Sequence, residues 1–67
     1  MDYSTDIELL KIYFRYTIYS KDSIKADVVS LLKRLEGLTS NKDIKPVIEQ
    51  LKAIRRNNIK YILNQRK

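Results

Sequence analysis

Apolar residues recur at every third or fourth position along three stretches of this chain, and this spacing limits what it can fold into. At 3.6 residues per turn, such positions share one face of an α-helix, whereas a half-buried strand would alternate apolar and polar residues. The chain contains only one Gly and one Pro, and no Asn-Gly or Asp-Gly pair that would mark a hairpin. The sequence therefore predicts an all-α protein without strands.

The first periodic stretch predicts a helix over about residues 5–19. Thr5 and Glu8 have the T-x-x-E spacing of a capping box, in which each side chain bonds a free backbone N–H at the helix start. Ile7, Leu10 and Phe14 recur at helical spacing and form the expected inner face.

Two further stretches predict helices over about residues 23–36 and 43–65. The inner face of the second is expected at Ile24, Val28, Leu31, Leu32 and Leu35, and Gly37 is expected as its C-cap. Pro46 is tolerated in a first turn, which places the start of the third helix at about Asp43. The expected inner face of this helix is Ile44, Val47, Ile48, Leu51, Ile54, Tyr61 and Ile62, and Arg55 and Asn58 fall on the same side.

These elements predict one domain over residues 1–67, a small three-helix bundle in which the third helix crosses an antiparallel first pair. A chain this short buries only roughly 60% of the surface that its unfolded form exposes. Its core is therefore thin, and good helix packing, self-association or a partner must add stability.

Several classes of function are disfavoured by what the chain lacks. With no Cys and no His, disulfides, most structural zinc sites and catalysis by His or Cys are excluded. The acidic residues suit helix starts and solvated faces, so we expect no enzyme activity and no cofactor. No apolar run approaches the roughly 18 residues of a membrane span, and the first six residues are acidic where a signal peptide would be basic. We therefore expect a cytoplasmic protein without a transmembrane segment.

Positive charge is concentrated at the C-terminal end of the chain. Residues 1–49 contain eight basic and eight acidic residues, whereas residues 50–67 contain six basic residues and no acid. A basic stripe along a helix is the electrostatic footprint of a phosphate binder. The candidate nucleic-acid-binding residues are Lys45, Lys52, Arg56, Lys60, Arg66 and Lys67. The alternative is a solvated helix end whose cations complement the helix dipole, although that effect needs only about the last turn.

The same region indicates contact with phosphates rather than with a particular base sequence. Asn57, Tyr61, Asn64 and Gln65 could add hydrogen bonds to phosphates or bases. A helix-turn-helix unit joins its helices by three or four residues, often around a Gly, and the polar connection here is expected to be longer. We therefore expect nonspecific or structure-directed binding.

The first helix carries more apolar surface than one core face requires. Its second surface consists of Leu9, Ile12, Tyr13, Tyr16 and Tyr19, and tyrosine is favoured where one side is buried and the other is wet. This surface predicts a dimer or partner interface. The alternative is that the helix touches two neighbours within the bundle and needs a wide apolar arc.

Two functional hypotheses follow. The first is a homodimeric accessory or regulatory protein that binds nucleic acid through its third helix. The second is a protein-interaction module, such as an inhibitor, an adaptor or a bacteriocin-immunity-like protein, that docks through the first helix. Salt-dependent binding to generic nucleic acid discriminates between them.

Overall fold

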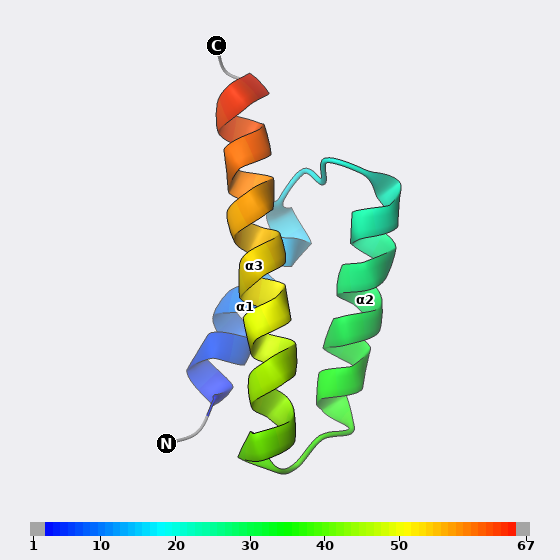
Figure 1. Cartoon of the computed structure of the whole chain (residues 1–67), viewed down its shortest axis with the longest axis vertical. Coiled ribbons are helices and arrows are strands. Elements are labelled where there is room, and N and C mark those ends of the chain that lie inside the picture. The colour runs from blue at the N-terminus through cyan, green and yellow to red at the C-terminus, as the bar shows by residue number, and fades with distance from the viewer. Residues whose placement is uncertain (1–2, 66–67) are drawn as a thin grey trace.

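A computed structural model describes residues 3–65 and shows an all-α three-helix bundle (Figure 1). The helices are α1 (Ser4–Tyr16), α2 (Asp22–Glu36) and α3 (Asn41–Gln65), and the described residues contain no strand. The predicted fold class is therefore confirmed. None of the helices within residues 3–65 combines the length and the apolar character needed to cross a membrane.

The longest helix, α3, organises the bundle. Its 25 residues span about 37 Å at 1.5 Å per residue, close to the 42 Å long axis of the molecule. Both α1 and α2 pack against α3, whereas they approach each other much less closely. The path of the chain makes α2 antiparallel to α3, while α1 crosses α3 and runs in the same general direction (Figure 1). The C-terminal turns of α3 extend past both other helices.

The core lies where the three helices meet. Residues at helical spacing on all three supply it, as the periodicity predicts. The buried apolar residues are Leu10, Phe14, Val28, Leu35, Ile44, Val47, Ile48 and Leu51. On α3, the last apolar residue that packs against this core is Ile54. The last three turns of the helix therefore lie beyond the apolar core.

The expected capping box at the start of α1 is wrong. The helix begins at Ser4, which places Thr5 inside the first turn, and the N-cap residue is Tyr3, which makes no side-chain cap hydrogen bond. The backbone N–H of Ile7 donates to the Tyr3 carbonyl over 2.9 Å. Gly37 is the C-cap of α2, as predicted. Its N–H donates to the Arg34 carbonyl over 3.1 Å, and the Leu38 N–H donates to the Leu35 carbonyl over 3.2 Å.

The first helix ends three residues earlier than the predicted boundary at 19. Thr17 has extended backbone angles (φ −88°, ψ 159°), so the helix ends at Tyr16 and residues 17–21 connect it to α2. Tyr19 therefore lies outside the helix on which we placed it. Its hydroxyl donates to the Phe14 carbonyl over 2.7 Å and occupies one of the carbonyls left free at the helix end.

The third helix begins earlier than expected, at Asn41 rather than near Asp43. The Ser40 carbonyl accepts the N–H groups of Asp43 and Ile44 and so opens the helix. Pro46 therefore lies in the second turn, where it removes the bond that its own N–H would make to the Lys42 carbonyl. Both residues are exposed, so water can replace that bond.

Candidate nucleic-acid interface

The predicted basic stripe on α3 is exposed over most of its described length. Lys45, Arg56 and Lys60 are exposed, and Lys52 is half-buried. Arg66 and Lys67 lie outside the described residues. Arg56 and Lys60 are one turn apart on α3. The last turns of this helix extend past α1 and α2 (Figure 1). Of the three cations of the stripe that are exposed within residues 3–65, two therefore lie in the C-terminal half of the helix.

An ion pair engages one member of the stripe. The Lys52 ammonium lies 3.7 Å from a carboxylate oxygen of Asp6 on α1, and both side chains are 38% exposed. Such a half-exposed pair contributes about 0–1 kcal/mol to stability, so a stronger anion can displace Asp6. Lys52 is therefore available to a phosphate only in competition with this carboxylate.

An acidic residue interrupts the stripe between its two ends. Glu49 is exposed and follows Lys45 by one turn, a spacing that places both on the same face of α3. Its negative charge separates Lys45 from the three cations that follow it along this face. Within the described residues, uninterrupted positive charge therefore begins at Lys52.

The neutral residues of the free end differ in exposure. Asn57, Asn64 and Gln65 are exposed, as hydrogen bonding to a ligand requires, whereas Tyr61 is half-buried. Two large apolar side chains lie among the cations, Ile59 at 39% exposure and Leu63 at 56%. The free end of α3 is thus a cationic helix with apolar positions on its surface.

Asn58 fixes the base of this free end. It is 2% exposed, and its side-chain oxygen accepts the backbone N–H of Ser20 over 3.1 Å. Its amide nitrogen lies 2.9 Å from the Ile18 carbonyl and 3.1 Å from the hydroxyls of both Tyr13 and Thr17. One buried side chain thus joins α3 to the end of α1 and to the α1–α2 connection.

Sequence reasoning placed Asn58 on the inner face of α3 but gave it no role. A polar residue at a buried position is expected to have hydrogen-bond partners, and that signal was present. The partners themselves, residues 13–20, are 38–45 positions away in the chain. The bonds become visible only once α1 and α3 are packed together.

The surplus apolar surface of α1 is smaller than predicted. Leu9, Ile12 and Tyr16 are exposed, at 55%, 55% and 77%. Tyr13 and Tyr19 are half-buried and pack against the core. Their rings flank Phe14, at 5.0 Å edge-on for Tyr13 and 6.1 Å stacked for Tyr19. These two tyrosines therefore pack within the bundle, as expected if α1 needs a wide apolar face to contact two neighbouring helices. The other three residues of the predicted face remain exposed.

The hydroxyl of Tyr19 is held in its neutral form. Burial, and then the neighbouring Tyr13, raises the pKa of Tyr19 above its ordinary value of 10.0. A neutral hydroxyl is the form that can donate to the Phe14 carbonyl. The group therefore acts as a structural donor at neutral pH.

The connection between α2 and α3 is shorter than expected. It consists of residues 37–40 and includes Gly37, so the expectation of a longer connection is wrong. A helix-turn-helix unit sets its two helices at about 90–120°. Here α2 and α3 instead run side by side in opposite directions, as in a helical hairpin (Figure 1). The geometry therefore gives no recognition helix of that type.

Among residues 3–65 there is no cluster of three or more acidic side chains that could hold a metal ion. No family model matches the chain, and neither a curated protein nor a solved structure matches it.

Proposed function

We propose that this protein binds nucleic acid without sequence specificity, through the C-terminal half of α3. One observation carries the proposal: residues 50–65, which include the part of α3 that extends past the rest of the bundle, contain basic residues and no acid. Phosphate contacts by Lys and Arg supply essentially all of the affinity in nonspecific binding, because they release condensed counterions.

The shape of the free end supports this assignment. The major groove of duplex DNA is about 12 Å wide and admits one α-helix, provided that no other element of the protein obstructs it. Beyond Asn58, α3 extends past α1 and the α1–α2 connection (Figure 1). Lys52 and Arg56 precede Asn58 and Lys60 follows it, so the stripe leads from the packed part of α3 onto this extension, over about 12 Å along the axis at 1.5 Å per residue. Single-stranded nucleic acid offers the same phosphates, and the half-buried Tyr61 ring is the nearest candidate for base stacking.

Salt dependence of binding tests the proposal. Affinity for mixed-sequence nucleic acid, measured by fluorescence anisotropy, should fall with salt at a log–log slope of about −0.9 per duplex phosphate contacted and about −0.7 per single-strand phosphate. Arg56→Ala or Lys60→Ala should lower affinity to a similar extent on all sequences and reduce the slope by roughly one unit. Lys52→Ala should have a smaller effect, because the wild-type lysine is already paired with Asp6.

The matched control is Lys33→Ala, which removes one exposed cation from α2. It should leave both affinity and slope nearly unchanged. If neither duplex nor single-stranded nucleic acid binds at low salt, the proposal is wrong. An equal loss for Lys33→Ala and Lys60→Ala would show that net charge, and not the free end of α3, determines binding.

A further inference from the structure

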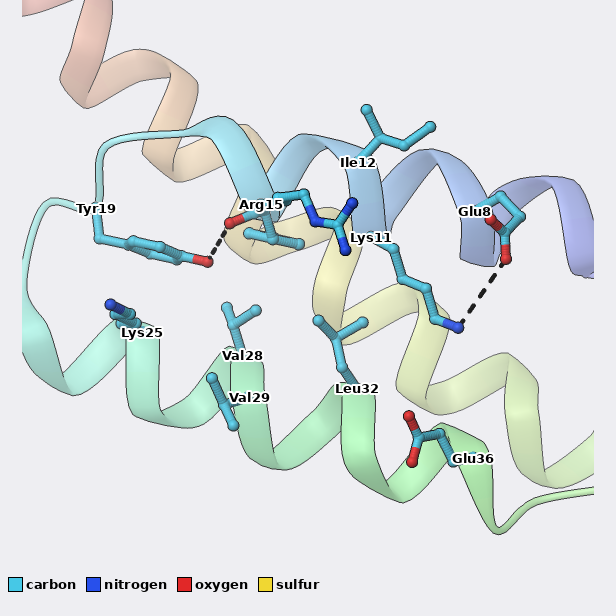
Figure 2. Close-up of a pocket in the computed structure, with 11 residues that line it drawn as sticks. Glu8, Lys11, Ile12, Arg15, Tyr19, Lys25, Val28, Val29, Leu32 and Glu36 are labelled. Atoms are coloured by element: carbon cyan, nitrogen blue, oxygen red, sulfur yellow. Dashed lines mark hydrogen bonds and ion pairs between the residues drawn. The ribbon is translucent and has the colours of Figure 1, made fainter.

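A groove runs between α1 and α2 on the side of the bundle away from α3 (Figure 2). Its volume is about 580 Å³. Phe14, Val28 and Leu32 form its apolar floor, and the first two are at most 4% exposed. Ile12 and Val29 lie at its two outer edges, on α1 and α2, and each is 55% exposed (Figure 2). Large apolar side chains thus border a channel that none of the described residues fills.

The groove lies where a fourth helix would pack if this were a four-helix bundle. In a four-helix bundle, two diagonally opposed helices have a further helix on each side, and the apolar stripes of all four meet in one core. Here α3 covers one side of the α1–α2 pair, and the two helices approach each other less closely than either approaches α3. A helix lying along the groove would cover Ile12, Val29 and Leu32 together, in the manner of a helix-in-groove complex.

Charge along the groove is graded from one end to the other. Arg15 and Lys25 lie toward the end marked by Tyr19, and neither forms an ion pair within the described part of the chain (Figure 2). Glu8 and Glu36 lie toward the opposite end. Between them, the Lys11 ammonium is 4.0 Å from Glu8, an exposed contact that a ligand can replace.

This gradient selects both the charge and the direction of a helical ligand. Unpaired cations on the walls favour acidic side chains flanking the apolar face of the ligand. A helix carries partial positive charge at its N-terminus and partial negative charge at its C-terminus. Its N-terminus therefore suits the Glu8–Glu36 end, and its C-terminus suits the Arg15–Lys25 end.

We infer that the α1–α2 groove binds an acidic amphipathic helix of a partner protein, oriented parallel to α1. No residue of α3 lines the groove. The proposed nucleic-acid site can therefore fail without affecting this inference, and the inference can fail without affecting that site.

A designed peptide of the same length as α1 tests the inference on the full chain. It carries Leu at i, i+3, i+4, i+7 and i+11 to form one apolar face, with Glu at the flanking positions. The comparison peptide has Lys at each Glu position. The acidic peptide should bind saturably in calorimetry, and amide resonances of Ile12, Lys25 and Val29 should shift in NMR spectra of the labelled chain. The basic peptide should bind at least about tenfold more weakly, because like charges would face each other across the groove.

Two exposed positions separate charge from apolar contact without disturbing the core. Arg15→Glu should lower the affinity for the acidic peptide about tenfold and raise the affinity for the basic peptide, since it reverses the charge of one residue lining the groove. Val29→Gln should weaken both peptides, because it removes apolar contact without adding charge. Lys33→Glu makes a charge change similar to that of Arg15→Glu, at an exposed α2 residue that does not line the groove, and should leave both affinities nearly unchanged.

A spin label at either end of the peptide tests the direction. A label at the N-terminus should broaden the amide signals of Glu8 and Glu36, and one at the C-terminus those of Arg15 and Lys25. The inference is overturned if neither peptide binds, if the two bind equally, or if the shifts fall outside the groove. It is also overturned in favour of a second copy if dilution of the chain alone shifts the signals of Lys25 and Val29, two groove residues on α2. The opposite broadening pattern would reject the parallel orientation.

Discussion

Asn58 shows how one polar side chain on α3 can determine where another helix, α1, ends. In the absence of tertiary contacts, the apolar spacing of the first stretch continues past Tyr16, and a helix to 19 was the natural prediction. The amide of Asn58 instead bonds the backbone of Ile18 and Ser20, which an extended connection presents and a continuing helix would not. The end of α1 is therefore determined by a residue on α3.

The first prediction concerns this residue. Asn58→Ala should lower the free energy of unfolding by about 2–3 kcal/mol, because it leaves the buried groups around it without their partner. Asn57→Ala is the matched control, since the neighbouring Asn is exposed, and it should change stability by less than about 0.5 kcal/mol. Urea titrations monitored by circular dichroism measure both. Similar values for the two variants would show that the Asn58 bonds contribute nothing to stability.

At the scale of the helices, predictability from sequence depends on how regular each apolar stripe is. The boundaries of α2 differ from the prediction by a single residue at the start, because a clean stripe and Gly37 define the element locally. The start of α1 also differs from the prediction by one residue, but the predicted capping box does not form, because Thr5 and Glu8 satisfy this short motif by chance. The start of α3 was misplaced because Pro46 was assumed to need the first turn, although it is accommodated in the second.

The inner face of α2 gives the second prediction. Leu35 is 5% exposed, so Leu35→Ala should cost about 2–5 kcal/mol and unfold much of so small a domain. Leu31 is half-buried, so Leu31→Ala should lower the free energy of unfolding by less than Leu35→Ala does. Lys33→Ala should change it by no more than about 0.5 kcal/mol. Thermal and urea unfolding of the three variants measure these losses of stability and so rank them. Equal, small effects at all three positions would reject the assignment of faces.

For the molecule as a whole, the sequence predicts less of the geometry around the candidate sites than of the fold. The concentration of positive charge could be counted directly from the sequence, but neither the Asp6–Lys52 pair nor the free extension of α3 follows from spacing alone. The α1–α2 groove could not be predicted either, because it depends on how far apart two helices lie once both pack on a third.

Self-association is a prediction at this scale. The thin core and the exposed Leu9, Ile12 and Tyr16 predict a dimer at micromolar concentration, which sedimentation equilibrium measures. Leu9→Lys or Tyr16→Lys should weaken it. Val29→Lys is the matched control, because Val29 has the same 55% exposure as Leu9 but lies on α2. A folded chain that remains monomeric at high concentration would contradict the dimer.

The most direct test of the central proposal is to locate the bound nucleic acid on the protein. A short mixed-sequence duplex is added to the isotope-labelled chain at low salt, and backbone amide shifts are followed by NMR. The proposal predicts shifts concentrated at Lys52, Arg56, Lys60 and the residues between them, which diminish as salt is raised. Shifts concentrated on α1 or α2, or no shift at any duplex concentration, would contradict it.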